Sequence, residues 1–154
     1  IMNYKIRRMR EEDIPQVVEI EKIAFSRPWS RSIFKATLLL PYAAYYVAVQ
    51  EENEIPEAQR ILGMCGVKKI FEEGEISNVA VHPDFRGNGI SRKMLEMLMR
   101  EAREDGVRAF TLEVRAGNSI AIRLYESLGF RTEGVRRGYY DHPVEDGLIM
   151  WQRP

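Results

Sequence analysis

Two glycines and an arginine directly before a predicted helix are the residues of this chain best suited to bind a phosphate. Arg86, Gly87 and Gly89 follow a short apolar segment, residues 79–81, and apolar residues recur from residue 90 at the 3.6-residue helical period. The first N–H groups of a helix have no intrahelical partner, and glycines let a ligand approach the backbone closely. These residues therefore predict a site for a phosphate or pyrophosphate.

Several interpretations of this loop compete. A Walker loop would end in Gly-Lys-Ser or Gly-Lys-Thr, and the chain has neither. A Rossmann fingerprint would need a third small residue where Arg92 stands. A glycine-rich turn without a ligand is the plainest alternative. Residues 86–91, Arg-x-x-Gly-x-Ser, resemble the acetyl-CoA loop of the GNAT superfamily of N-acetyltransferases, although Ser91 stands where glycine or alanine is usual.

A second segment, LEVRAGNSIAIRLYESLGF at residues 112–130, strongly resembles the ribosomal-protein-alanine N-acetyltransferase branch of that superfamily. Further matches are Pro-Trp-Ser at residues 28–30, Arg-x-Tyr-Tyr at residues 137–140 and Glu-Asp at residues 145–146. The resemblance covers essentially the whole chain. The segment 51–59 looks longer than usual in the family, and residues 151–154 carry no family signal.

The resemblance implies acetyl transfer from acetyl-CoA to a primary amine. Because the amine must be neutral to attack, a base is needed, and Glu113 can serve directly or through a water. The departing thiolate needs a proton, and Tyr125 matches the family's general acid. Carried over by position, the backbone of Val79, Ala80 and Val81 would contact pantetheine, and Asn118 would be a further cofactor contact. The residues that would hold the pyrophosphate are Gly87, Asn88, Gly89, Ile90, Ser91 and Arg92. The acceptor contacts are Trp29, Tyr139 and Tyr140.

Composition narrows the partners. The chain has 154 residues, 45% of them hydrophobic, which predicts one domain over residues 1–154. Lys plus Arg and Asp plus Glu both number 23, so no broad nucleic-acid surface is expected. No apolar run approaches the ~20 residues of a membrane span. A charged N-terminus shows no signal peptide, so a cytoplasmic protein is expected.

Metal and thiol chemistry are not expected. The two histidines, His82 and His142, lie far apart in the sequence and predict no metal site; each is a weaker candidate for the base than Glu113. The single cysteine, Cys65, excludes an intrachain disulfide and a cysteine metal cluster, and its apolar neighbours predict a small buried thiol.

The elements that must position these residues follow from periodicity and capping. Strands are predicted at residues 4–9, 42–50, 60–71, 75–82, 109–114, 130–136 and 148–152. Helices are predicted at residues 12–25, 30–40, 90–104 and 118–128, with Ile120, Ala121, Leu124, Tyr125 and Leu128 on the inner side of the last. Together with the resemblance, this predicts an α/β GNAT fold with a mixed, mostly antiparallel sheet, helices on both faces and a cofactor cleft between splayed central strands.

Three local expectations accompany this fold. The apolar alternation slips once near Asn78, which predicts a β-bulge where an amide-rich ligand such as pantetheine could join as a partial strand. Trp29 and Phe34 are placed to form a hydrophobic staple. Glu21 falls on the apolar face of the first helix; a carboxylate paired with a cation, or one at the rim, is the favoured interpretation, and a carboxylate lining a substrate cleft is the alternative.

The first functional hypothesis is an acetyltransferase for the N-terminal α-amine of proteins, acting by direct transfer in a ternary complex, with a ribosomal protein's N-terminal alanine as a target. An enzyme for a small-molecule amine is the second, and the Tyr139–Tyr140 pair, which resembles a peptide-clasping loop, argues against it. A non-catalytic acetyl-CoA-binding module is the third, and the set Glu113, Asn118 and Tyr125 argues against it. A monomer or weak homodimer that binds neither nucleic acid nor membrane is expected; the acceptor protein, the strictness for its first residue and the oligomeric state stay open.

Overall fold

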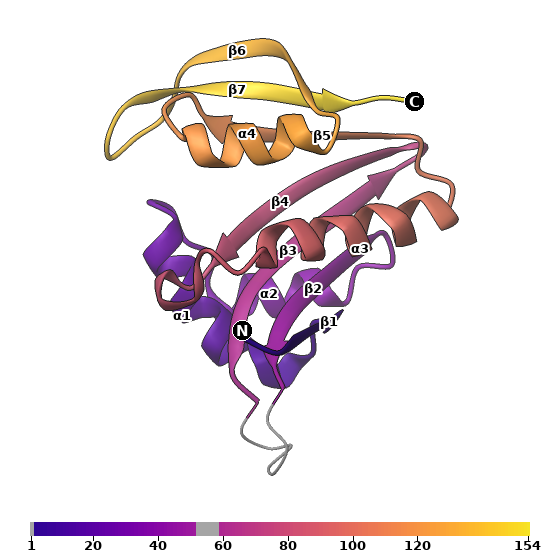
Figure 1. The fold of residues 1–154 in the computed structure, drawn as a ribbon, viewed down its shortest axis with the longest axis vertical. Coiled ribbons are helices and arrows are strands. Elements are labelled where there is room, and N and C mark those ends of the chain that lie inside the picture. Colours follow the sequence, from indigo (N-terminus) through magenta and orange to yellow (C-terminus); the bar gives the residue numbers. More distant parts are fainter. Residues whose placement is uncertain (1, 52–58) are drawn as a thin grey trace.

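A seven-stranded sheet runs through the whole molecule in the computed structural model, which describes residues 2–51 and 59–154 (Figure 1). The strand order is β1-β2-β3-β4-β5-β7-β6. The strands are β1 (Tyr4–Arg8), β2 (Ala43–Gln50), β3 (Ile61–Ile70), β4 (Glu73–Val81), β5 (Ala109–Arg115), β6 (Arg131–Tyr140) and β7 (Glu145–Gln152). The helices are α1 (Ile14–Ala24), α2 (Arg31–Leu38), α3 (Ile90–Glu104) and α4 (Ser119–Ser127), with a short 3₁₀ turn, η1 (Glu11–Asp13), before α1.

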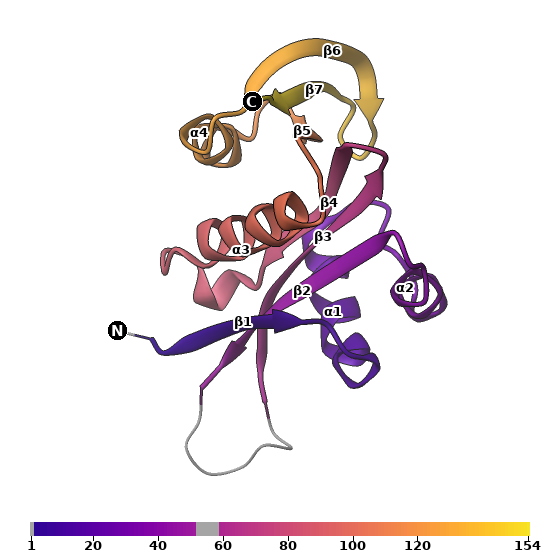
Figure 2. The same ribbon diagram turned by 90° about the vertical axis from the view of Figure 1, so that its right-hand side faces the viewer.

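Helices cover both faces of the sheet. Figure 2 shows α1 and α2 on one side and α3 and α4 on the other. The alternation of side chains along each strand divides the interior into two apolar clusters, so Tyr46 of β2 packs with α3 while its neighbour Tyr45 packs with α1 and α2. Cys65 is fully buried in the α3 cluster, which confirms the predicted buried thiol. The mixed sheet with helices on both faces is also as predicted.

One pair of neighbouring strands separates along its length. β4 and β5 are the parallel pair, and they are joined only from Glu73↔Ala109 to Glu75↔Thr111. Farther along, β4 turns away, and the strands diverge (Figure 1). Ser77 pairs with Gly66 and Ala80 with Met64, so two residues of β4 face the single residue Cys65 of β3. The bulge predicted near Asn78 is therefore confirmed.

The helix caps predicted from the sequence are present in the structure. The Ser30 hydroxyl accepts a hydrogen bond from the backbone N–H of Ile33 at the start of α2, and the Trp29 and Phe34 rings lie 5.2 Å apart as the predicted staple. Asn118 caps α4, because its side chain accepts from the N–H of Ala121 at 3.2 Å.

Two expectations are wrong in detail. Tyr139 and Tyr140 end strand β6 rather than lie in a loop, because Tyr140 still pairs with Glu145 of β7 and lengthens the hairpin. Ile120 is 78% exposed rather than on an inner side of α4; only Tyr125 of that helix is buried, so α4 buries a narrower stripe than its apolar pattern suggests. Most of the 51–59 segment, residues 52–58, lies outside the described residues.

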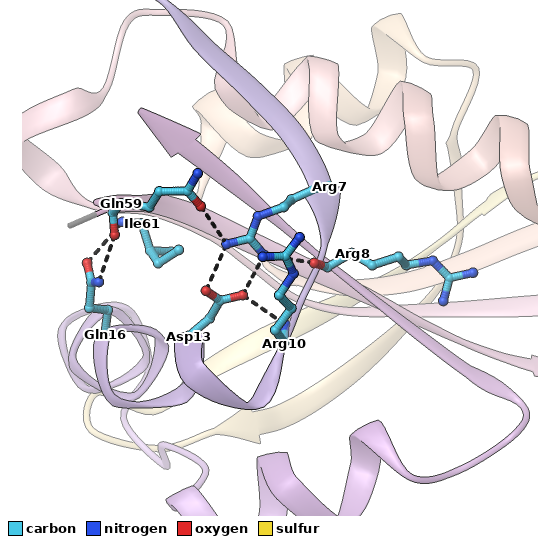
Figure 3. Close-up of polar contacts among 7 residues, drawn as sticks. All are labelled: Arg7, Arg8, Arg10, Asp13, Gln16, Gln59 and Ile61. Carbon is cyan, nitrogen blue, oxygen red and sulfur yellow. Dashed lines mark hydrogen bonds and ion pairs between the residues drawn. The ribbon is translucent and has the colours of Figure 1, made fainter. Parts of the chain in front are cut away.

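An ion pair ties strand β1 to the 3₁₀ turn η1, which leads into α1 (Figure 3). Both terminal nitrogens of Arg7 donate to the two carboxylate oxygens of Asp13, at 2.7 and 2.9 Å. The same Asp13 carboxylate accepts from the backbone N–H of Arg10 at 2.8 Å, and Arg7 also donates to the side chain of Gln59 just before β3. Both charged side chains are largely buried, at 14% and 8% exposure, so each depends on the other.

Removing one partner of this ion pair should lower the free energy of unfolding, and replacing both partners with apolar residues should lower it much less. We expect Asp13→Ala to lower the free energy of unfolding by about 3 kcal/mol, because the Arg7 guanidinium would be left buried without a counter-charge. The double variant Arg7→Met/Asp13→Leu should recover most of that loss. Urea unfolding followed by circular dichroism measures both. A double variant at least as unstable as Asp13→Ala would contradict this account of the pair.

Candidate active site

A cleft of about 860 Å³ opens on the α1 side of the sheet, where β4 and β5 separate. Its walls come from the end of α1, the α1–α2 loop, β4, β5 and the β6–β7 hairpin. Four residues predicted from the sequence to be catalytic or acceptor-binding line it: Glu113, Trp29, Tyr139 and Tyr140. They lie up to 111 positions apart in the sequence, from 29 to 140, and the fold brings them to one cavity.

Glu113 faces this cleft from β5. One carboxylate oxygen, Oε1, lies 3.3 Å from Nε of Arg136, and the other, Oε2, has no hydrogen-bond partner within the described residues. Glu113 is also the largest cause that raises the pKa of Tyr139 above its ordinary value. Although Oε2 is buried, the Glu113 side chain as a whole lines the cleft and is 29% exposed, so the carboxylate can accept a proton from a bound group.

Tyr125 lies on the other side of β5. It projects from α4 into the apolar cluster that includes Leu112, and its ring lies 6.0 Å from that of Phe130. It does not line the cleft that holds Glu113. Burial raises the pKa of Tyr125 above its ordinary value, which keeps the phenol protonated and able to donate. A reactant in contact with both groups would have to lie between the separated strands.

The predicted anion site has the expected backbone. Gly87 and Gly89 both have positive φ angles, +82° and +70°, and Gly89 directly precedes the first residue of α3. The loop is fixed from two sides: the Asn88 side chain donates to the carbonyl of Phe85 at 2.8 Å, and the Tyr4 hydroxyl donates to the carbonyl of Asn88 at 3.0 Å. This leaves the helix N-terminus turned outward, where it can bind an anion.

The other residues predicted to bind the cofactor differ in how exposed they are. Ile90 is 2% exposed and belongs to the α3 cluster, so its side chain is not available to a ligand. Arg92 is exposed, and its guanidinium donates to Ser127 Oγ at 2.6 Å, which joins α3 to α4. Val79 and Val81 are half-buried and Ala80 is buried, in the part of β4 that has left β5.

Sequence reasoning missed Arg115. Its guanidinium donates to the carbonyls of Asp141 and Pro143, both at 2.9 Å, and stacks on the Tyr140 ring at 4.6 Å from its centroid. It also reaches Ser26 Oγ in the α1–α2 loop at 3.3 Å. Arg115 therefore links the two loops that border the cleft. Its place two residues after Glu113, on the same face of β5, is the signal that could have indicated it.

The favoured interpretation of Glu21 is wrong. Its side chain is 1% exposed, and no cation pairs with it in the part of the chain that the structure describes. Instead, Oε1 accepts from Asn78 Nδ2 at 3.0 Å and from the backbone N–H of Trp29 at 3.3 Å. Glu21 is part of the cleft wall, in keeping with the alternative interpretation. Burial raises its pKa, and the two hydrogen bonds act in the opposite direction.

Neither a metal-binding cluster nor a membrane-spanning helix occurs in residues 2–51 and 59–154. Within these ranges, no group of three or more His, Cys, Asp and Glu side chains is arranged to hold a metal ion. None of the helices described combines the length and the apolar character needed to cross a membrane.

Known proteins resemble this chain in sequence and in fold. The model of the acetyltransferase (GNAT) family matches residues 14–130. The ribosomal protein bS18-alanine N-acetyltransferase of Escherichia coli (strain K12) is 33% identical over 142 residues, which cover 92% of this chain and 89% of that protein. The crystal structure of the ribosomal-protein-S18-alanine N-acetyltransferase from Escherichia coli matches with a TM-score of 0.85 at 31% identity, covering 98% of this chain and 94% of that one. The Salmonella typhimurium protein yncA, solved with its cofactor acetyl-CoA, matches with a TM-score of 0.79 at 25% identity, covering 98% and 94%.

The buried Glu21 carboxylate predicts a pH-dependent stability. Because its pKa is raised on folding, wild-type protein loses stability as the pH rises above the ordinary glutamate value of about 4.3. Glu21→Gln does not titrate, so it should be more stable than wild type at pH 7, by roughly 2–4 °C in melting temperature, and the gain should vanish near pH 4. Glu19→Gln, on the exposed side of the same helix, is the control. Equal melting temperatures for wild type and Glu21→Gln from pH 4 to 8 would refute the prediction.

Proposed function

The chain belongs to the acetyltransferase (GNAT) family, and we propose that it acetylates the N-terminal α-amine of a protein, with acetyl-CoA as donor. The observation that carries the proposal is the arrangement of two sites on opposite faces of one opening in the sheet. The anion loop, residues 86–91, lies at the α3 side, and the cleft with Glu113 and the paired tyrosines lies at the α1 side. A donor and an acceptor can therefore meet between β4 and β5 without competing for space.

The donor side fits acetyl-CoA. Beyond Glu75, β4 has no partner in β5, so backbone groups of Val79 to Val81 are free to hydrogen-bond the amides of pantetheine. The N–H groups of residues 87–92 would hold the pyrophosphate at the start of α3. Asn118 uses its side-chain oxygen to cap α4, which leaves its amide N–H₂ to donate to the cofactor.

In the proposed chemistry, Glu113 and Tyr125 act from opposite faces of β5. The Glu113 carboxylate accepts a proton from the α-ammonium, directly or through a water, so that a neutral amine attacks the thioester carbonyl. Tyr125, held protonated by burial, donates to the departing sulfur. Transfer is direct, because Cys65 is buried in the α3 cluster and burial raises its pKa, which leaves no thiolate to form an acetyl intermediate.

The acceptor side fits an extended peptide. The Tyr139 and Tyr140 rings meet edge to face at 5.0 Å across the cleft from Trp29, and their hydroxyls can hydrogen-bond a peptide backbone while the rings cover the first side chain. We infer a small first residue, alanine or serine. The names of the relatives make ribosomal protein bS18 the first acceptor to test. A single domain, residues 1–154, carries both sites.

A panel of short peptides tests this function. Wild-type protein should turn over acetyl-CoA with peptides that begin with a free alanine or serine, and should fail when the same α-amine is blocked. A peptide whose only free amine is an internal lysine, and a polyamine, are the comparison acceptors. Robust turnover on the polyamine alone, or on the blocked peptide with its free lysine, would overturn the proposal.

The anion loop gives a direct prediction for donor binding. Gly89→Asp should weaken acetyl-CoA binding by at least about tenfold, because a carboxylate at the start of α3 repels the pyrophosphate. Gly106→Asp is a matched control: Gly106 also has a positive φ, +96°, with nothing within 4 Å of an added Cβ, but it lies at the other end of α3. Calorimetry measures both. Equal loss of affinity in the two variants would assign the effect to backbone strain.

The two catalytic candidates should affect turnover and spare donor binding. Glu113→Gln and Tyr125→Phe should each lower kcat by ~10²–10⁴-fold, the usual cost of losing a general base or acid. The loss in Glu113→Gln should shrink as pH rises, because more of the acceptor amine is already neutral. Glu73→Gln, at the exposed start of β4, is the control. Wild-type turnover by both purified variants would mean that the site is misplaced.

A further inference from the structure

A single buried carboxylate joins the acceptor loop to the bulged strand. Glu21, near the end of α1, is 1% exposed and accepts two hydrogen bonds on Oε1. One comes from the backbone N–H of Trp29 in the α1–α2 loop, and the other from the side chain of Asn78 in β4. Both donors belong to the lining of the cleft, and they are 49 positions apart in the sequence.

The Asn78 contact continues into the sheet. Asn78 has a φ of +57°, and its side-chain oxygen accepts from the hydroxyl of Tyr45 in β2 at 3.1 Å. That hydroxyl also lies 3.1 Å from Ser77 Oγ, and the Tyr45 ring lies 6.0 Å from Trp29. The side chain at the bulge is thus fixed from both ends, by Glu21 on its N–H₂ and by Tyr45 on its oxygen.

The geometry favours a positioning role for Glu21 over direct contact with a reactant. Oε1 is already occupied by two donors, and Oε2 is inaccessible and has no partner within the described residues. A buried carboxylate without a counter-charge destabilises the fold, so an apolar residue would serve packing better. What the carboxylate supplies is one acceptor atom shared by the loop and the bulge.

We propose that Glu21 is a positioning residue that sets the distance between the Trp29 loop and the Asn78 bulge. The loop faces the acceptor, and the bulge directly precedes the β4 backbone groups assigned to the donor. Glu21 therefore aligns the two substrates with each other. This inference rests on the proposed function for its consequence in turnover, but its effect on donor binding can be measured without any acceptor.

Three variants separate a hydrogen-bonding role from a role of charge. Glu21→Ala removes the shared acceptor; Glu21→Gln keeps an oxygen at that position but no charge; Asn78→Gly deletes the amide and tolerates the positive φ. We expect Glu21→Ala and Asn78→Gly each to raise the acetyl-CoA Kd and the peptide KM by about tenfold, and the double variant to be no worse than either. Glu21→Gln should stay within about threefold of wild type, as should the control Glu19→Ala.

Calorimetry with acetyl-CoA, steady-state kinetics with an alanine-first peptide and thermal melting of every variant make up the experiment. Damage by Glu21→Gln equal to that by Glu21→Ala would overturn the proposal in favour of a role for the charge. Unchanged Kd and KM in Asn78→Gly, or losses that multiply in the double variant, would also overturn it. If Glu21→Ala does not fold, Asn78→Gly and Glu21→Gln decide alone. A wild-type protein that binds acetyl-CoA but does not acetylate the peptide would contradict the proposed function. The acetyl-CoA Kd values of the variants would still test the positioning role of Glu21.

Discussion

The separation of β4 from β5 determines where the two proposed substrate sites can lie. Only three residue pairs join these strands, and the bulge at Asn78 then turns β4 away. An open parallel pair leaves backbone donors and acceptors without partners, which a sheet normally avoids. Here the opening connects the two faces of the sheet, with α1 and α2 on one side and α3 and α4 on the other (Figure 2).

Strand alternation then assigns chemistry to each face. Successive side chains of β5 point to opposite sides, so Glu113 faces the cleft while Leu112 packs in the cluster that contains Tyr125. The two environments differ as their proposed roles require: the Glu113 side chain lines the cleft and is 29% exposed, and burial holds Tyr125 protonated. The proposed base, Glu113, and the proposed acid, Tyr125, lie on opposite faces of the same strand, β5. Both can therefore act on reactants that meet beside that strand.

What the sequence could predict was local. The slip in alternation located the Asn78 bulge, and capping residues located the starts of α2 and α4, because these features depend on neighbours within a few positions. The partners of Glu21 and Arg115 could not be predicted in this way. Glu21 meets Asn78 at a separation of 57 residues, and Arg115 binds backbone carbonyls, which no side-chain pattern reveals. The sequence predicts a loop at Tyr139 and Tyr140, because the strand character of this segment comes from pairing with β7.

In the proposed mechanism, donor and acceptor approach from opposite faces of the sheet and meet between β4 and β5. A crystal structure with coenzyme A covalently joined to the α-amine of an alanine-first peptide tests it most directly. We expect the sulfur in the opening between Glu113 and Tyr125, with the pyrophosphate at residues 87–92 and the peptide between Trp29 and the paired tyrosines. A peptide that leaves the opening on the α3 side, alongside the coenzyme, would contradict it.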